Sequence, residues 1–173
     1  MNIRKASPAD LIEVLYLLHV CIQEMNSKGW IHWDLENLTV KDDIEDGIVF
    51  IYKENETCLG MVTLTTEEAP EYKDVLWNQM PGRPLLVKRL IVHSKWHTQG
   101  IEKQLITFAE QFGIENGFSS LRLDVFAENK EAVALYEQLN FKYSGEIMFQ
   151  YQKVPNTCFE KVLNAEPMKV SQK

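Results

Sequence analysis

The chain has 173 residues, of which 45% are hydrophobic and 25% are charged, and its formal net charge is -7. This length fits one domain with a substantial core, and the acidic balance disfavours broad electrostatic binding to nucleic acid or anionic membranes. Met1–Lys5 leads into a polar stretch rather than a signal segment, and no apolar run reaches the ~18 residues of a membrane span. Three widely spaced cysteines argue against a disulfide framework, and the four histidines lack metal-ligand spacing. We therefore expect a cytoplasmic protein without a metal site.

The sequence pattern of residues 1–64 predicts a strand, two helices and a hairpin. Ile3 lies in a short strand, and Ser7 with Pro8 forms a helix start. An apolar stripe of helical period follows as far as Met25. A shorter helix is expected over 40–46. Strands over 48–52 and 58–64 then form an antiparallel hairpin, in which Gly60 indicates a bulge or a close backbone approach.

Two aromatic segments lie between the regular elements. Trp30 and Trp33 fall in a loop, where they either pack onto the core or form a wall of a substrate pocket. The polar connection 66–84 is unusually long, which indicates a functional segment or a short helix. We expect a helix over 72–80 and a lid that directs Tyr72 and Trp77 into a pocket.

The rest of the chain alternates strands and helices. A strand over 85–93 precedes a helix over 99–116, and a second strand with period two covers 120–126. Ala132, Leu135, Tyr136 and Leu139 share a face of the next helix, and two strands follow, near 141–146 and 158–163. The pattern predicts one mixed α/β domain over 1–164 and a flexible tail over 165–173.

The turn over 94–103 connects a strand to a helix through Gly100. Such a turn leaves backbone N–H groups free at the helix start, and these groups together with the helix dipole suit a phosphate. A plain strand-to-helix turn is the simpler interpretation of the same residues.

Two motifs make the chain resemble the GNAT superfamily of N-acetyltransferases. The segment from Asn129 to Phe141 reads Asn-x-x-Ala-x-x-Leu-Tyr-x-x-x-x-Phe, and Gly100 matches the central glycine of the family's Arg/Gln-x-x-Gly-x-Gly/Ala turn. The resemblance covers nearly the whole chain. It implies a single α/β domain with a mixed, mostly antiparallel sheet of about seven strands flanked by about four helices. It also implies that acetyl-coenzyme A (acetyl-CoA) is the cofactor.

The phosphate-binding turn departs from the family pattern at two positions. His97 stands where Arg or Gln is usual, and Glu102 stands where a small residue is usual. A glutamate that points at the pyrophosphate would weaken its binding, whereas one that points to solvent would leave the backbone donors available. Lys95 and Lys103 are close enough in sequence to offset its charge.

The resemblance assigns residues to three roles. Tyr136 would donate a proton to the thiolate, because a phenol stays protonated at neutral pH; a core aromatic is the alternative. The general base is open among Glu128, Asp124, Glu67 and His93, and we assign Glu128. Acceptor contacts fall to Trp30, Trp33, Trp77, Arg89 and Asp124, although Arg89 and Asp124 also suit a solvated strand face or an internal ion pair. The residues implied to bind the cofactor are Leu90, Ile91, Val92, Thr98, Gln99, Gly100, Ile101, Glu102, Lys103, Asn129, Ala132 and Tyr136.

Three functions remain open at this point. The first is transfer of an acetyl group to a primary amine of a small molecule or peptide by direct attack in a ternary complex. The second is a degenerate domain that binds coenzyme A, or regulates, without transferase activity. The third, an unrelated nucleotide-phosphate binder, lacks the Gly-x-Gly-x-x-Gly and Gly-Lys-Ser/Thr patterns. A homodimer is left open by the resemblance, because many members of the family pair.

Overall fold

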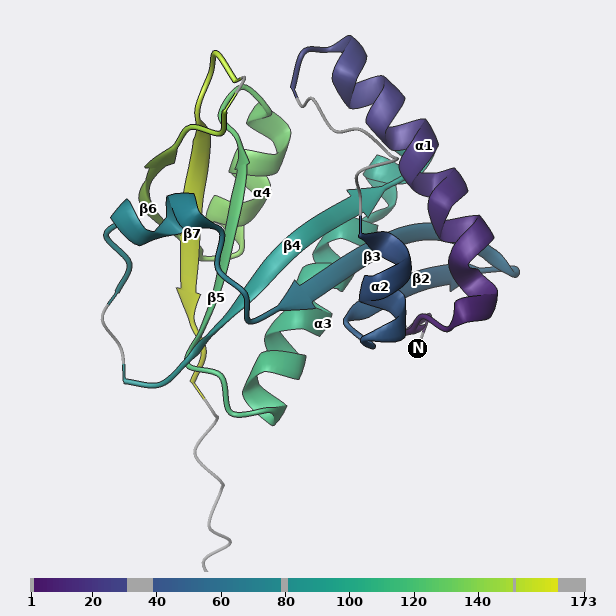
Figure 1. Cartoon of the computed structure of the whole chain (residues 1–173), viewed down its shortest axis with the longest axis horizontal. Helices are drawn as coiled ribbons and strands as arrows, with labels where there is room; N and C mark the ends of the chain where they lie inside the picture. Colours follow the sequence, from purple (N-terminus) through teal and green to yellow (C-terminus); the bar gives the residue numbers. More distant parts are fainter. Residues whose placement is uncertain (1, 31–38, 79–80, 151, 165–173) are drawn as a thin grey trace, which may run out of the picture.

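The computed structural model describes residues 2–30, 39–78, 81–150 and 152–164. They form a seven-stranded sheet of order β1-β2-β3-β4-β5-β7-β6, in which β4 and β5 are parallel and the other neighbours are antiparallel (Figure 1). The predicted α/β class and element order are confirmed. The strands are β1 (Ile3–Lys5), β2 (Val49–Glu54), β3 (Thr57–Thr65), β4 (Pro84–Val92), β5 (Ser120–Phe126), β6 (Lys142–Ile147) and β7 (Asn156–Val162).

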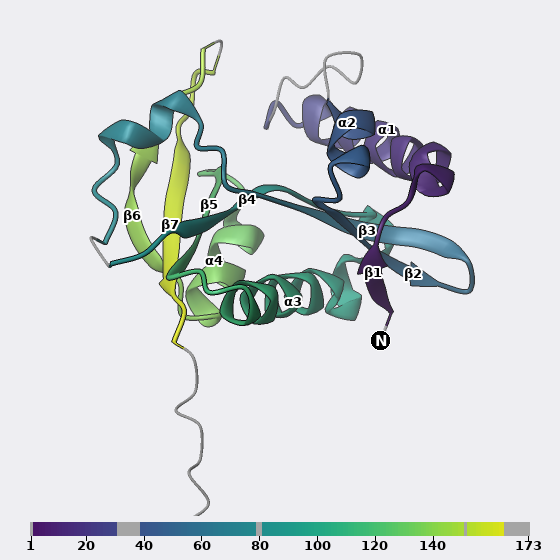
Figure 2. The same cartoon turned by 60° about the horizontal axis from the view of Figure 1, so that its bottom comes forward.

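Helices cover both faces of the sheet. Figure 2 shows α1 and α2 on one face and α3 and α4 on the other. The α-helices are α1 (Leu11–Ser27), α2 (Val40–Glu45), α3 (Ile101–Glu115) and α4 (Lys130–Gln138), and the 3₁₀ helices are η1 (Pro8–Asp10), η3 (Pro70–Asp74) and η4 (Ser94–Gln99).

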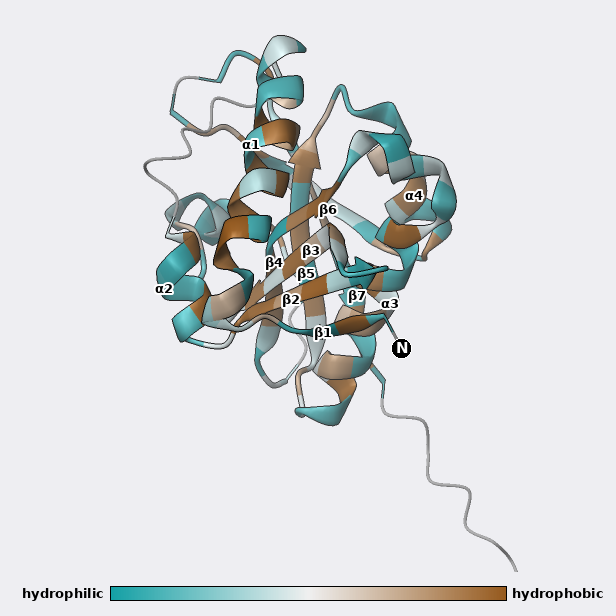
Figure 3. Cartoon of the chain, turned by 90° about the vertical axis from the view of Figure 1, so that its right-hand side faces the viewer, coloured by the Kyte–Doolittle hydropathy of each residue, from teal (hydrophilic) through white to brown (hydrophobic). Residues whose placement is uncertain are grey.

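The core is divided between these two faces. Met61 packs in a cluster with α1 and α2, whereas its neighbour Val62 packs in a cluster with α3. This division follows from the alternation of side chains along a strand. Because both faces of β3 are buried, most of the strand is apolar instead of alternating with polar residues (Figure 3).

Gly60 in β3 allows α3 to pack closely on the sheet. The register between β2 and β3 shifts next to its partner Tyr52, which confirms the predicted bulge. A Cβ atom at Gly60 would lie 3.1 Å from Leu105 Cδ1 and 3.2 Å from Ile101 Cγ2. Both residues belong to α3, so the close approach expected from the sequence is the contact between this helix and β3.

The connection between β3 and β4 differs from the prediction. A helix was expected from Tyr72, but the 3₁₀ helix η3 begins at Pro70, whose fixed φ suits a first helical position, and ends where Val75 turns extended. Tyr72 is buried among Val75, Leu86 and other residues. The segment therefore packs its tyrosine onto the sheet, and Tyr72 faces inward without lining the pocket described below.

A buried carboxylate on β7 links the connection between β3 and β4 to the sheet through hydrogen bonds. Glu160 on β7 is 4% exposed, and it accepts hydrogen bonds from the Asn78 backbone N–H at 2.7 Å, Ser120 Oγ at 3.0 Å and Arg122 Nε at 2.6 Å. Arg122 also pairs with Glu68 at 3.0 Å. Three donors thus surround one charge, which joins the connection, β5 and β7.

Replacing Glu160 by glutamine is expected to lower the free energy of unfolding by about 3 kcal/mol, because Arg122 loses its buried partner. Urea denaturation measures this change. The control is Glu146→Gln on the neighbouring strand β6, where the exposed side chain predicts a change below about 0.5 kcal/mol. Equal changes in both variants would show that the buried network contributes little.

Candidate active site

The site begins where two parallel strands separate. β4 and β5 pair from Pro84↔Ser120 to Leu86↔Arg122 and then diverge (Figure 1). A register shift between β3 and β4 leaves Lys88 without a Cα partner on β3, two residues after Leu86, where the pairing of β4 with β5 ends. The later parts of both strands therefore direct backbone N–H and C=O groups into a gap in the sheet.

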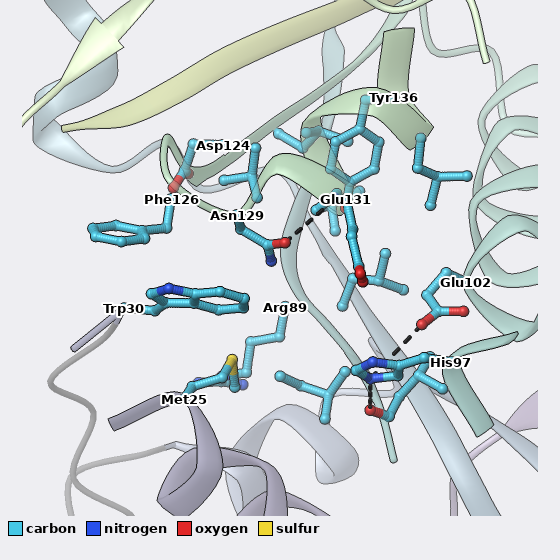
Figure 4. Close-up of a pocket in the computed structure, with 18 of the residues that line it drawn as sticks. Met25, Trp30, Arg89, His97, Glu102, Asp124, Phe126, Asn129, Glu131 and Tyr136 are labelled. Carbon is cyan, nitrogen blue, oxygen red and sulfur yellow. Dashed lines mark hydrogen bonds and ion pairs between the residues drawn. The ribbon is translucent and has the colours of Figure 1, made fainter. Parts of the chain in front are cut away.

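A pocket of about 550 Å³ occupies this gap and reaches both faces of the sheet. Its walls come from the end of α1, the diverging strands, the start of α3 and one side of α4 (Figure 4). A ligand could therefore enter from the α3 and α4 face and meet a second ligand that lies on the α1 face.

The start of α3 has the glycine turn and the helix start that the sequence predicts. Gly100 has φ +74°, a left-handed conformation that favours glycine, and the space where its Cβ would lie is open. The Gln104 N–H donates to Gly100 O at 3.1 Å. The N–H groups of residues 101–103 precede this first helical bond and so form the donor end of the helix.

Glu102 turns toward the pocket at this helix start. It lines the pocket, its side chain is 22% exposed, and Oε1 lies 3.8 Å from His97 Nε2. Burial raises the pKa of the Glu102 carboxyl, while its own backbone N–H and His97 act in the opposite direction. His97 Nε2 also lies 2.8 Å from Val92 O. The Glu102 side chain therefore lines the pocket and is not directed away from it into solvent.

Helix α4 presents Asn129 and Tyr136 to the pocket. Asn129 Oδ1 accepts from the Ala132 N–H at 3.2 Å, so this residue caps α4 as well as lining the pocket. Tyr136 is 5% exposed, and its ring lies 5.7 Å from Phe141 and 5.9 Å from Phe159 between centroids. Burial raises the pKa of the Tyr136 phenol above its usual value, so this group stays protonated at neutral pH.

Asp124 on β5 is a carboxylate that lines the pocket between the two faces. Oδ2 accepts from Tyr72 Oη at 2.5 Å, and Oδ1 accepts from Asn156 Nδ2 at 2.7 Å. Burial raises the pKa of the Asp124 carboxyl, and the two hydrogen bonds partly oppose this shift. The carboxylate is thereby held in one orientation and made a stronger proton acceptor than an ordinary aspartate.

The α1 side of the pocket is aromatic and basic. Trp30 lies opposite Phe126, with ring centroids 6.5 Å apart, and Lys28 Nζ lies 4.6 Å from the Trp30 ring centroid (Figure 4). Arg89 is buried on β4, and its Nη1 lies 2.6 Å from Asp43 Oδ2. This side therefore combines an apolar wall with cationic groups.

The structure places most of the sequence-predicted site residues around this one pocket. Thr98, Gln99 and Ile101 are not among its lining residues, and Ile101 is 2% exposed in the core. Glu128 is exposed just beyond β5, also outside the lining. The predicted residues that line the pocket are Trp30, Arg89, Leu90, Ile91, Val92, Gly100, Glu102, Lys103, Asp124, Asn129, Ala132 and Tyr136.

Two of the three tryptophans predicted to contact the acceptor, Trp33 and Trp77, are not among the described lining residues. Trp77 lies outside the pocket lining, because its Nε1 donates to Tyr72 O at 3.0 Å and its ring lies 4.7 Å from the Arg122 guanidinium. Trp33 belongs to residues 31–38, which lie outside the described residues. The predicted tail over 165–173 also lies outside them.

Several lining residues have no local sequence signal. Met25 and Lys28 come from the end of α1, and Phe126 and Asn156 from the ends of β5 and β7. The helical period of α1 identifies its buried face but does not show that the helix end reaches the strand gap.

Two further searches cover only the described parts of the chain. No cluster of three or more His, Cys, Asp or Glu side chains suited to a metal ion occurs within them. None of the helices formed by these residues has the length and apolar character needed to cross a bilayer.

Comparison with known proteins identifies the family. Residues 16–141 match the model of the Acetyltransferase (GNAT) family. Human N-acetyltransferase 8 is 28% identical over 117 residues, a match that covers 67% of this chain and 48% of the relative. The chain thus spans about half the length of that relative.

Solved structures share the fold. A GNAT-family acetyltransferase from Listeria monocytogenes has a TM-score of 0.72 at 21% identity, covering 93% of this chain and 94% of its own. The ribosomal-protein-S18-alanine N-acetyltransferase from Escherichia coli has a TM-score of 0.69 at 14% identity, covering 98% of both chains. With the family match over residues 16–141, the chain belongs to the GNAT family of acetyltransferases.

Proposed function

We propose that this protein transfers the acetyl group of acetyl-CoA to a primary amine of a small molecule or peptide by direct attack in a ternary complex. The observation that carries the proposal is the pocket between β4 and β5, whose lining residues come from both faces of the sheet. The cofactor would approach from the α3 and α4 face, and the amine from the α1 face. Holding the reactants side by side supplies much of the acceleration.

The residues present fit acetyl-CoA with one opposing feature. The N–H groups of residues 101–103 would hold the pyrophosphate, and Leu90, Val92 and Asn129 would contact the pantetheine arm. Glu102 opposes this fit, because its carboxylate lies at the same helix start. A domain that binds coenzyme A without catalysis is the alternative, and Glu102 is the feature in its favour.

Acetyl-CoA supplies a thioester carbonyl for the amine to attack and a thiolate that leaves. A β4 backbone N–H near Leu90–Val92 would polarise the carbonyl oxygen. Tyr136, protonated at neutral pH, would give its proton to the thiolate. Asp124 would take the proton that the amine loses, and we prefer it to Glu128 because Asp124 lines the pocket and Glu128 does not.

Two measurements test the proposal. Calorimetry with acetyl-CoA measures cofactor binding, and a thiol-release assay over a panel of primary amines measures transfer. We expect both binding and release. Binding without release from any amine would support the non-catalytic module, and no binding at millimolar concentration would contradict both.

Replacing Glu102 by glutamine is expected to strengthen acetyl-CoA binding about tenfold, or about 1.4 kcal/mol. The substitution keeps the shape of the side chain but removes a negative charge beside the pyrophosphate position. Calorimetry measures the dissociation constant. The matched control is Glu115→Gln at the far end of α3, which should leave it unchanged.

The pH dependence of binding provides a second readout for Glu102. Burial raises its pKa, so a falling pH neutralises the carboxyl earlier than it would an exposed glutamate. Wild-type affinity should therefore rise as the pH falls toward that value, and more steeply than in Glu102→Gln. The neighbouring charges of Lys103 and Glu131 are present in both proteins. Equal slopes in the two proteins would contradict this role for Glu102.

A further inference from the structure

The α1 side of the pocket carries more positive than negative charge, although the whole chain has a net charge of -7. Lys28, Lys88 and Arg89 line this side of the pocket, and Glu24 is the acidic lining residue that accompanies them. On the α3 and α4 side, the charged lining residues include Glu102, Glu131 and Lys103, and Asp124 on β5 lies between the two sides. The two ends of the pocket therefore differ in charge.

Arg89 is the buried member of the basic group. The residue is 6% exposed, and it lies in a strand whose neighbouring residues also line the pocket. Figure 4 shows its side chain on the same side of the pocket as Met25 and Trp30. A guanidinium excluded from bulk water in this way binds an anion more strongly than an exposed one.

Asp43 neutralises only part of this charge. Its Oδ2 lies 2.6 Å from Arg89 Nη1, and its Oδ1 lies 3.0 Å from Lys88 Nζ. One carboxylate thus faces two cations, which leaves a formal charge of about +1 on the three groups. Asp43 is 5% exposed and is not a lining residue, so it supports Arg89 from behind. A guanidinium has five N–H donors arranged to bind a carboxylate in a bidentate manner.

We propose that Arg89, oriented by Asp43 and assisted by Lys88, binds a carboxylate of the acceptor, so that the acceptor is an amino acid rather than a simple amine. The inference rests on the proposed function, because it concerns the same pocket. Trp30 and Phe126 add an apolar wall on this side, which suits an acceptor with an apolar side chain. Its amine would then face Asp124, the acidic lining residue on β5.

The test compares each standard α-amino acid with its carboxamide as acceptor, at saturating acetyl-CoA, by thiol release. The two forms differ in charge at the position assigned to Arg89. We expect kcat/KM for the preferred amino acid to exceed that for its amide by about 10- to 100-fold, the range for hydrogen bonds to charged groups. Wild-type protein that transfers to amides as well as or better than to acids would overturn the inference, whatever the variants do.

Variants then locate the effect. In Arg89→Gln, the ratio of acid to amide should fall about tenfold or more relative to wild type, and comparing ratios cancels the difference in amine basicity between the two acceptors. Arg89→Lys should retain part of the preference. Arg83→Gln, an exposed arginine outside the pocket, should retain all of it. Asp43→Asn with Arg89→Gln removes both members of the ion pair and replaces the single variant if the latter fails to fold.

Each outcome bears on a distinct claim. A purely structural Arg89 would lower the melting temperature of Arg89→Gln without changing the acid-to-amide ratio, which would overturn the inference. Weaker acetyl-CoA binding in that variant, at an unchanged ratio, would place Arg89 on the cofactor and would also overturn it. Transfer to amides alone leaves the proposed function intact, whereas transfer to no amine at all counts against the proposed function itself.

Discussion

Replacing Tyr136 by phenylalanine is expected to lower kcat about 100-fold, the lower end of the range for loss of a general acid. The thiolate that leaves must gain a proton, and the Tyr136 phenol lines the pocket on α4. Burial raises its pKa, so the group carries its proton throughout the neutral range. Steady-state thiol release at saturating amine measures the change.

The structure predicts that this substitution affects catalysis alone. The ring packs against Phe141 and Phe159 through its carbon atoms, and phenylalanine preserves those contacts. The dissociation constant of acetyl-CoA and the melting temperature should therefore remain close to wild type. Tyr143→Phe on β6, where the tyrosine is 63% exposed, is the matched control. An unchanged kcat in Tyr136→Phe would remove this residue from the mechanism and leave it as a core aromatic.

Local patterns were enough to predict the order of the elements, whereas the mostly antiparallel sheet was implied by the resemblance to the GNAT superfamily. The period-two stretch from Ser120 to Phe126 is strand β5, and the apolar stripe ending near Met25 is helix α1. Each pattern depends on neighbouring residues and on which side of an element is buried. The error over the helix predicted at 72–80 is local too, because Pro70 starts a 3₁₀ helix two residues before the expected start.

The site could be predicted only in part, because it depends on long-range geometry. The sequence identified Gly100 and Tyr136 by motif, but the separation of β4 from β5 after Leu86 follows from how two distant strands pack. The direction of the Glu102 side chain is a matter of rotamer and burial that no spacing encodes. The sequence left open whether Arg89 contacts the acceptor or belongs to a solvated strand face or an internal ion pair. Its pairing with Asp43 joins residues 46 positions apart.

The general base is another feature that the sequence alone could not identify. Glu128 and Asp124 are four residues apart, and the sequence offers no reason to separate a pocket carboxylate from a surface one. In the structure Asp124 lies within β5 and Glu128 just beyond it, next to the cap of α4. Only the former lines the pocket, which makes its removal informative.

Replacing Asp124 by asparagine is expected to lower kcat/KM about 100-fold at neutral pH, because the amine loses its proton acceptor. The pH dependence of kcat/KM in the wild-type protein should show whether Asp124 acts as the proton acceptor. Burial raises the pKa of Asp124, so the carboxyl remains protonated and inactive as a base to a higher pH than an ordinary aspartate. The wild-type rate should fall as the pH drops through that raised pKa. This contribution should be missing from Asp124→Asn, in which only the titration of the amine remains.

Tyr72→Phe separates a proton acceptor from a merely structural aspartate. The Tyr72 phenol donates to Asp124 Oδ2 at 2.5 Å and lowers the pKa of that carboxyl. Without this donor the pKa of Asp124 should rise further, and the acidic fall in kcat/KM should move to higher pH. Asp74→Asn, an exposed aspartate on η3, should leave the profile in place. A structural Asp124 would lower the rate at every pH in Tyr72→Phe without moving the profile, so the position of the acidic limb decides between the two roles.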